Sequence, residues 1–287
     1  MRKLVSIWLF VGWMQPLVYS QAYEPSLIWR ISGNGLSKSS YLFGTIHAIC
    51  NNDFFLPPAA EKALAESEQL ALELKMDDPL LLLELQKGMM MPQGNHLKNL
   101  LSASDYERLN RFLLEAVHMD LSFLGFMKPI ALASLLYPQL MNCNTTASYE
   151  LKLMEIAKKQ NKQIIGIETV ADQLKVFDAV PLEQQTQMLM EMLNKQEEQT
   201  KEMQALVQDY KQQNINALYE RFKKSSFATQ QFEDELLTNR NRSWVDKIVS
   251  WSSQKAIFYA VGAGHLGGPN GLIALLRSKG FVVEPVQ

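Results

Sequence analysis

Two stretches near opposite ends of the chain decide the fold: Tyr41-Leu-Phe-Gly44-Thr-Ile-His47 and Tyr259-Ala-Val-Gly262-Ala-Gly-His265. Each is an apolar run that begins with an aromatic residue and is followed by Gly, two residues and His. Such a run predicts a buried strand that ends near the Gly. Each His is therefore expected on the turn just beyond the carboxyl end of a strand, which is the edge where open α/β sheets bind ligands.

Strand and helix patterns alternate outward from these two units. The runs rich in β-forming residues are Ser26–Ser32, Ser40–Ile46, Gln69–Leu74, Gln163–Glu168, Ala256–Val261 and Phe281–Val286, and the helical patterns between them are Ala59–Ser67, Tyr149–Gln160 and Pro269–Lys279. Alternation of this kind favours parallel strands joined by helical crossovers. We predict an α/β fold with a mostly parallel central sheet, built from two related halves that each carry a strand–Gly-x-x-His unit.

Two long segments, residues 77–142 and 181–253, show helical periodicity and no strand pattern. The second segment is rich in Gln, Glu, Lys and Met but lacks the sustained heptad of a coiled coil. Both are predicted to be helical insertions, with amphipathic helices packed on a single domain that spans residues 23–287.

The N-terminus has the pattern of an export signal. A basic start at Arg2 and Lys3 precedes an apolar stretch over residues 4–18, and small or polar residues follow at 20–22. We expect residues 1–22 to be a cleaved signal peptide, which places the chain in the periplasm or outside the cell. The alternative is an uncleaved anchor, although the apolar run is short and is broken by Gly12 and Pro16. No later stretch is long and apolar enough to predict a membrane span.

Charge and cysteine content narrow the possible functions. The 287 residues carry a formal net charge of −2 and no long basic run, so no nucleic-acid partner is expected. Cys50 and Cys143 are the two cysteines, and export would place them in an oxidising compartment, where a pair tends to be bonded. The sequence thus suggests a Cys50–Cys143 disulfide, with two buried, inert thiols as the alternative.

Two carboxylates also follow predicted strands. Glu73 and Glu168 stand at strand ends, where a buried charge is costly unless it is paired or binds a metal. If these strands are parallel neighbours, both Glu converge with His47 and His265 on one sheet edge. Imidazole and carboxylate suit Zn, Mn, Co or Fe, and a bound metal ion can make a water nucleophilic at neutral pH. Alternatively, each His is a hydrogen-bonded turn residue, Glu73 forms a salt bridge, and Glu168 caps the helix after it.

The last unit contains a competing motif. Gly262-Ala-Gly264-His-Leu-Gly267 matches the dinucleotide fingerprint G-x-G-x-x-G after a strand and before a helix, and Glu284 follows at the end of the next strand. His265 would lie in the phosphate turn, and the matching unit at Gly44 has no such glycine run. Nucleotide binding is therefore kept only as a lesser alternative.

Five segments, taken in order, resemble motifs of the TraB/GumN family, which is related to the Tiki proteases. They are Tyr41–His47, Leu70–Leu74, Gly166–Thr169 with Gln173, Thr238–Asn241 with Trp244, and Val261–Gly268 with Gly271, Leu275 and Gly280. The resemblance covers nearly all of the chain after the signal. One position departs from it, because Glu150 stands where many relatives carry Asp.

The resemblance implies an α/β fold with helical insertions and a metal-dependent hydrolase. In it, His47, Glu73 and His265 match the motif residues tied to activity, and they are the expected ligands of a divalent metal ion such as Zn, Mn or Co. Arg240 and Asn241 match family positions as well, and an Arg there can hold a carboxylate or stabilise an oxyanion.

We therefore predict an exported metal-dependent hydrolase that acts on peptides or small secreted substrates. The candidate catalytic residues are His47, Glu73, Glu168, Arg240, Asn241 and His265. The general base and the oligomeric state are left unassigned. The second hypothesis is a binding or shutdown factor that sequesters a peptide without cleaving it, with the helical insertions and their Met-rich faces forming the groove.

Overall fold

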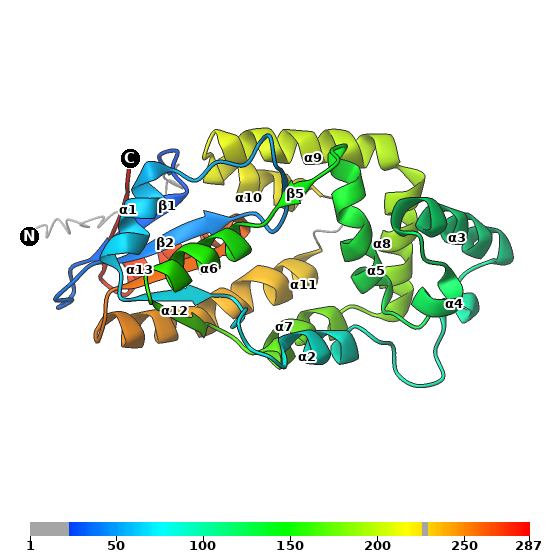
Figure 1. Cartoon of the computed structure of the whole chain (residues 1–287), viewed down its shortest axis with the longest axis horizontal. Coiled ribbons are helices and arrows are strands. Elements are labelled where there is room, and N and C mark those ends of the chain that lie inside the picture. The colour runs from blue at the N-terminus through cyan, green and yellow to red at the C-terminus, as the bar shows by residue number, and fades with distance from the viewer. Residues whose placement is uncertain (1–22, 226–228) are drawn as a thin grey trace, which may run out of the picture.

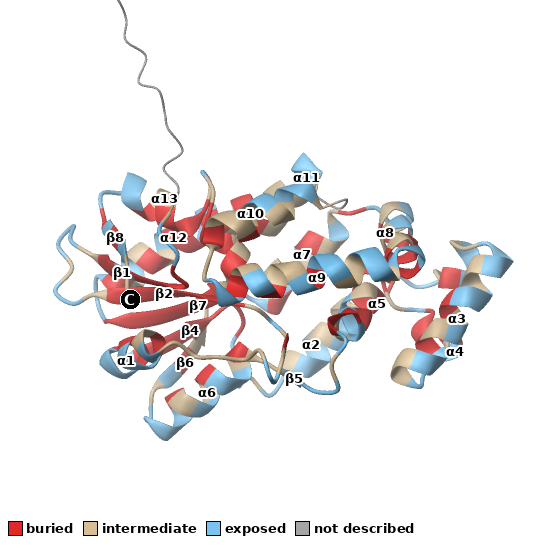
Figure 2. Ribbon diagram, turned by 90° about the horizontal axis from the view of Figure 1, so that it is seen from above, coloured by how far each residue is buried: buried red, intermediate tan, exposed pale blue. Residues whose placement is uncertain are grey.

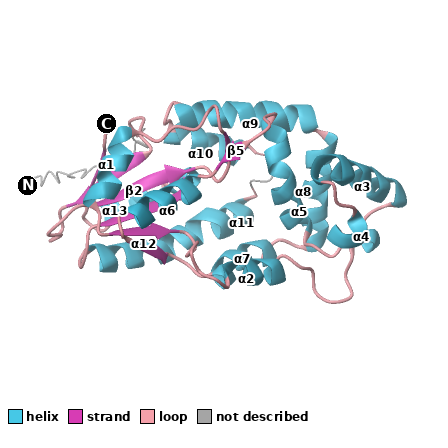
Figure 3. Ribbon diagram, in the orientation of Figure 1, coloured by secondary structure: helices cyan, strands magenta, loops and turns pink. Residues whose placement is uncertain are grey.

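The computed structural model describes residues 23–225 and 229–287. The predicted signal peptide, residues 1–22, lies outside this range. Strands gather at one end of the molecule and the other end is helical throughout (Figure 1, Figure 3). The strands are β1 (Ile28–Ser32), β2 (Ser40–Thr45), β3 (Ile49–Cys50), β4 (Gln69–Leu72), β5 (Thr146–Ala147), β6 (Gln163–Gly166), β7 (Ile257–Gly262) and β8 (Val282–Pro285).

The α-helices are α1 (Pro58–Glu66), α2 (Leu81–Gly88), α3 (Ala103–Val117), α4 (Leu121–Leu124), α5 (Pro129–Leu136), α6 (Tyr149–Lys159), α7 (Val170–Asp178), α8 (Leu182–Asn194), α9 (Gln196–Lys211), α10 (Ile215–Lys224), α11 (Gln230–Glu233), α12 (Asn239–Ser252) and α13 (Leu272–Ser278). Single 3-10 turns are η1 (Leu97–Asn99), η2 (Tyr137–Met141) and η4 (Ala263–His265), and η3 (Asp234–Thr238) is a π-helical turn. No helix within 23–225 and 229–287 combines the length and apolarity needed to cross a bilayer.

The central sheet has six strands in the order β6-β4-β7-β2-β1-β8. The first four are parallel, whereas β1 runs antiparallel to both β2 and β8. The predicted α/β class and mostly parallel sheet are confirmed; construction from two related halves stays a prediction. The six predicted strands are present, each within a few residues of its expected bounds.

Helices cover both faces of this sheet. In Figure 2, α1 and α6 lie on one side of the strands, and α12 and α13 lie on the other. Every residue of β2 and β4 is buried, as expected for strands packed on both faces. The sequences of these strands are apolar without alternation because both of their faces are buried.

The two predicted insertions are helical and share a second hydrophobic core. Buried residues of α3, α4 and α5 pack against Leu189, Met190, Met192 and Leu193 of α8. This cluster is separate from the larger one around the sheet. The segments 77–142 and 181–253 thus pack on each other as well as on the sheet domain.

Cys50 and Cys143 form a disulfide with a Cα–Cα distance of 5.9 Å, which confirms the predicted bond. Beside it, β3 and β5 pair as a two-stranded antiparallel ribbon in which Ile49 faces Ala147 and Cys50 faces Thr146. The sequence pattern does not predict this ribbon. A strand of two residues is too short to show the alternation by which strands are recognised.

Candidate functional site

The four parallel strands bring the predicted residues to one sheet edge. Gly44 of β2 pairs with Val261 of β7, while Leu72 of β4 pairs with both Ala260 of β7 and Gly166 of β6. His47, His265, Glu73 and Glu168 each follow one of these strands at its carboxyl end. The strand order therefore places all four at the edge that binds ligands in open parallel sheets.

Gly44 allows the two Gly-x-x-His segments to pack closely. A Cβ at Gly44 would lie 2.8 Å from Leu266 Cδ1 and 3.1 Å from Ala263 Cα. Such contacts require one segment to shift. The glycine of the first segment thus makes room for the turn of the second.

Arg240 lies at the centre of the site. One of its nitrogens, Nη2, donates to Glu73 Oε2 and to Glu168 Oε1, both at 2.6 Å. Its Nε donates to Glu168 Oε2 at 3.1 Å, which makes the pair with Glu168 bidentate. The remaining nitrogen, Nη1, lies 3.1 Å from His265 Nε2 and 3.0 Å from the carbonyl oxygen of Leu236. A single guanidinium thus contacts both carboxylates and one of the two predicted imidazoles.

A π-helical turn immediately precedes Arg240. Residues Asp234–Thr238 form this turn between α11 and α12. A π turn shifts the register of a helix and leaves a carbonyl without its usual partner, and such turns are frequent at functional sites. Here the Leu236 carbonyl accepts a hydrogen bond from the Arg240 side chain, which helps to direct the guanidinium toward the strand ends.

Each buried carboxylate has further donors. Glu73 accepts from the backbone N–H of Gly262 at 2.8 Å and from Gln173 Nε2 at 3.2 Å. Burial alone would raise the pKa of Glu73, but the charges of Arg240 and the nearby imidazoles outweigh it and lower that pKa to about 2. Burial instead raises the pKa of Glu168, against the opposing effect of Arg240. Glu73 is therefore a fixed negative charge at neutral pH.

Glu168 is not the cap of the following helix. That cap is Thr169, whose side chain and Asp172 form a capping box at the start of α7. Glu168 instead accepts a hydrogen bond from Trp244 Nε1 at 3.1 Å, in addition to its two contacts with Arg240. The ring of Trp244 also lies 4.4 Å from the His265 ring and 4.6 Å from the Arg240 guanidinium. Trp244 thus packs against three members of the site.

The surrounding hydrogen bonds fix the tautomer of His265. The amide nitrogen of Asn241 donates to the carbonyls of Asn270 and His265, so its Oδ1 is an acceptor and receives a hydrogen bond from the protonated Nδ1 of His265 at 2.7 Å. Nε2 is then unprotonated and accepts from Arg240. Burial, together with the charge of Arg240, lowers the pKa of His265 to about 3. His265 is therefore neutral at pH 7, and its distance of 3.9 Å from Glu73 Oε1 does not represent an ion pair.

His47 lies at the rim of the site and pairs with a different carboxylate. Its Nδ1 is 3.1 Å from Glu150 Oε1, and 74% of its side chain is exposed, against 14% for Glu150. Thr45 and Ser148 donate to Glu150 through their hydroxyl groups, each at 2.9 Å. The hydrogen bond to Glu150 raises the pKa of His47 to about 9, although desolvation opposes this shift. His47 is therefore protonated at neutral pH.

The disulfide-linked ribbon carries this pair. His47 precedes β3 by two residues, and β5 is followed at once by Ser148, the N-cap of α6, and then by Glu150. Glu150 is not among the site residues predicted from the sequence. Its alignment with an acidic position of the family was the available signal.

The donors do not assemble a metal site in this geometry. No group of three His, Cys, Asp or Glu side chains in the described parts of the chain is placed to hold a metal ion. Arg240 lies among Glu73, Glu168 and His265, and the Nδ1 of His47 is directed to Glu150. Metal binding by His47, Glu73 and His265 therefore stays a prediction.

The glycine-rich turn gives little support to nucleotide binding. The N–H of Gly262, the first glycine of the fingerprint, already donates to the carboxylate of Glu73. A phosphate would need that donor and would meet a buried negative charge beside it.

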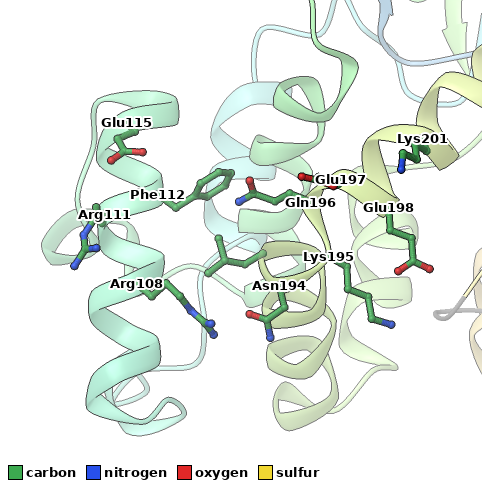
Figure 4. A pocket seen from close by; sticks show the side chains of 11 residues that line it. Arg108, Arg111, Phe112, Glu115, Asn194, Lys195, Gln196, Glu197, Glu198 and Lys201 are labelled. Carbon is green, nitrogen blue, oxygen red and sulfur yellow. The ribbon is translucent and has the colours of Figure 1, made fainter.

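A hollow of about 760 Å³ lies elsewhere, between α3 and the junction of α8 with α9 (Figure 4). Charged side chains of both signs line it, among them Arg108, Arg111, Glu115, Lys195 and Glu198. It contains none of the predicted site residues, and Lys195 is already paired with Glu191 at 2.6 Å. The buried cluster at the sheet edge is therefore the better candidate site.

Comparison with known proteins gives the family. The sequence profile of the TraB/PrgY/gumN family matches residues 27–285, which cover the sheet, both insertions and every residue of the site. The chain belongs to this family. The resemblance seen in the sequence motifs is thereby confirmed.

Relatives of this family member carry the name metalloprotease. Metalloprotease TIKI2 of Xenopus tropicalis is 26% identical over 92% of this chain and 60% of its own length. Metalloprotease TIKI2 of Danio rerio is 24% identical over 92% of this chain and 62% of its own length. Human Metalloprotease TIKI1 is 34% identical, over 31% of this chain and 17% of its own. The chain spans about three fifths of the length of the first two relatives. No solved structure gives a significant match.

Proposed function

We propose that this protein is an exported hydrolase that cleaves peptide bonds at the sheet edge formed by Glu73, Arg240 and His265. The observation that carries the proposal is the buried cluster itself, in which a neutral imidazole, an arginine and two carboxylates meet at the carboxyl ends of parallel strands. Perturbed pKa values in such a place are typical of functional sites. The relatives are named metalloproteases, which agrees with this reaction class.

The chain's own groups have distinct roles in this proposal. The five N–H groups of Arg240 already donate to Glu73, Glu168, His265 and the Leu236 carbonyl, so in this proposal its role is to stabilise negative charge on a carbonyl oxygen through its positive charge. The protonated His47 at the rim can donate a proton to a leaving amine, with Glu150 holding its orientation. Asn241 fixes the tautomer of His265 and is a positioning residue.

Glu73 and His265 are weak proton acceptors, because their pKa values are lowered to about 2 and about 3. Neither is assigned as the general base. The names of the relatives imply a divalent metal ion such as Mn, Co or Zn, and we include metal dependence in the proposal. The present donor geometry does not fit such an ion, so no catalytic step is assigned to it.

Export is the second part of the proposal. It is supported by the signal-like residues 1–22 and by the Cys50–Cys143 disulfide, because such bonds persist in oxidising compartments. A periplasmic or extracellular location follows from it.

The test uses the purified protein, residues 23–287, with a library of unstructured peptides. Products are identified by mass spectrometry with chelator alone and with added Mn²⁺, Co²⁺ or Zn²⁺. The expected result is cleavage that requires one of these ions. Absence of new peptide ends under every condition would exclude peptide hydrolysis, and cleavage that persists in chelator would exclude metal dependence.

A peptide-binding factor without catalysis is the second candidate. It is favoured by exposed apolar side chains at the start of α2. Leu80, just before the helix, is 57% exposed, and Leu82 and Leu83 within it are 77% and 47% exposed. Of the methionines in the two insertions, Met190, Met192 and Met203 are buried, whereas Met90 is 39% exposed, so a groove lined by methionine stays a prediction. Peptides retained by the protein in pull-down without cleavage, and lost on Leu82→Ser substitution, would support this alternative.

A further inference from the structure

The indole of Trp244 lies against both partners of the contact between Arg240 and His265. Its ring is 4.6 Å from the Arg240 guanidinium and 4.4 Å from the His265 ring, and these two partners are themselves 3.1 Å apart, from Nη1 to Nε2. The indole Nε1 donates to Glu168 Oε2 at 3.1 Å, and Glu168 also accepts from Arg240. Trp244 thus contacts the guanidinium directly and also binds the carboxylate that the guanidinium binds.

The first two turns of α12 bring these side chains together. Arg240 and Trp244 are four residues apart in this helix, and residues at that spacing lie on the same helical face. Trp244 is 1% exposed, so its indole N–H needs a hydrogen-bond partner within the protein. The partner is a carboxylate, which makes the bond charge-assisted. The helix therefore directs the indole toward the strand ends.

The hydrogen-bond partners of Arg240 lie around the edge of its guanidinium. The N–H groups of an arginine lie in the plane of the group and point outward from it. In Arg240 they donate to Glu73, Glu168, His265 and the carbonyl of Leu236. Hydrogen bonds tolerate a broad range of angles, so these bonds fix the position of the guanidinium better than its tilt. The indole lies over the guanidinium at a cation–π distance, and this contact with its face opposes a tilt.

We propose that Trp244 is a positioning residue, whose indole fixes the plane of the Arg240 guanidinium and its contact with His265 at the sheet edge. The effect on the reaction rests on the proposed function, in which Arg240 acts through its positive charge. The orientation of the guanidinium can be measured without any substrate. The alternative is that Trp244 only fills the hydrophobic core, to which Val245 and Ile248 of the same helix also belong.

Proton exchange at the Arg240 side chain tests the positioning, by NMR of protein with ¹⁵N-labelled arginine. The Nε–H of Arg240 donates to Glu168 and the side chain is 10% exposed, so this proton should exchange slowly with water. Its signal is assigned by its absence in Arg240→Lys. Trp244→Leu removes both the aromatic face and the N–H donor, and should accelerate the exchange at least about tenfold. Trp244→Phe keeps an aromatic face and should give a smaller increase.

Two controls separate positioning from a loss of core packing. Ile248→Ala shortens a fully buried side chain of the same helix, so it should lower the melting temperature but leave the exchange of the Arg240 Nε–H at the wild-type rate. The Nε–H of Arg221, which pairs with Asp209 on the helical side, is the internal reference and should be unchanged in every variant. If Trp244→Leu does not fold, Trp244→Phe, which fills most of the same space, carries the test.

Kinetics with an identified peptide test the effect on the reaction. Trp244→Leu should lower kcat at least about tenfold with KM changed less than about twofold, and Trp244→Phe should recover part of the loss. The inference is overturned if the Arg240 Nε–H exchanges at the wild-type rate in both variants, if Ile248→Ala accelerates it equally, or if kcat is unchanged. If the wild type cleaves no peptide, the proposed function fails, and the exchange rates alone decide whether Trp244 positions the guanidinium.

Discussion

At the scale of single residues, the two histidines of the repeated motif have opposite protonation states. His265 is buried and neutral, with a pKa lowered to about 3, whereas His47 is exposed at the rim with a pKa raised to about 9. The cause is the partner of each ring: Arg240 for His265 and Glu150 for His47. The sequence predicts that both imidazoles reach one sheet edge, but it cannot predict these partners, because Arg240 and Glu150 come from helices far along the chain.

The pair His47–Glu150 gives a prediction for pH. His47 has a raised pKa, so its stabilising contribution is complete below its ordinary value of 6.5 and is lost as the pH rises toward about 9. Glu150→Gln removes the carboxylate and should return the pKa of His47 toward 6.5, as followed by NMR of the imidazole protons. An unchanged pKa in this variant would show that Glu150 is not the cause; His118, an exposed histidine at the end of α3, serves as the reference ring.

At the scale of secondary-structure elements, the turn after β7 depends on the close approach of β2. Gly44→Ala places a methyl group 2.8 Å from Leu266 Cδ1 and should lower the free energy of unfolding by about 1–3 kcal/mol. Gly264→Ala is the matched control, because its new Cβ would lie 3.8 Å from Leu237 Cδ2, an ordinary contact. Urea denaturation measures both, and equal losses in the two variants would contradict the packing explanation.

The disulfide joins the elements that carry His47 and Glu150. It joins residues that are 93 positions apart in the sequence. In the chain-entropy description, breaking a cross-link that closes a loop of this size lowers the free energy of unfolding by about 4–5 kcal/mol. The double variant Cys50→Ser, Cys143→Ser should lose most of this stability in urea denaturation, and reduced wild type should match it. A loss below about 1 kcal/mol would mean that the ribbon β3–β5 holds without the bond.

The elements also show the limits of sequence patterns. The six sheet strands are predictable because each contains apolar β-forming residues, and those of β2 and β7 are almost entirely buried. The ribbon of β3 and β5 is not predictable, since each of these strands has only two residues. The π turn before Arg240 is also not predictable from the sequence. It depends on a shift of one residue in the helical register, and the composition of this helix is ordinary.

At the scale of the whole molecule, the buried apolar residues form two separate hydrophobic cores. One surrounds the sheet and the other joins α3, α4, α5 and α8 (Figure 2). The sequence predicts helical insertions, but amphipathic periodicity does not identify which helix a face will contact. That residues 77–142 pack against α8 could therefore not be foreseen.

The second core should behave as a separate unit in hydrogen exchange. Leu189 is fully buried in it, and Leu189→Ala should cost about 2–5 kcal/mol. Hydrogen–deuterium exchange by mass spectrometry should then show faster exchange in α3, α5 and α8, with protection of β2, β4 and β7 retained. Faster exchange spread evenly over the sheet and the helices would show instead that the two cores unfold together.

We expect peptide bonds to be cleaved at the edge where His265 and Arg240 meet. The most direct measurement is kcat/KM for one identified peptide, comparing His265→Gln with the wild type and with His118→Asn as the matched surface control. We expect a loss of at least about 100-fold for His265→Gln with its circular dichroism unchanged, because His265 Nε2 accepts from the Arg240 guanidinium and holds it at the sheet edge, and no loss for His118→Asn. A folded His265→Gln protein that cleaves the peptide as well as the wild type would contradict it.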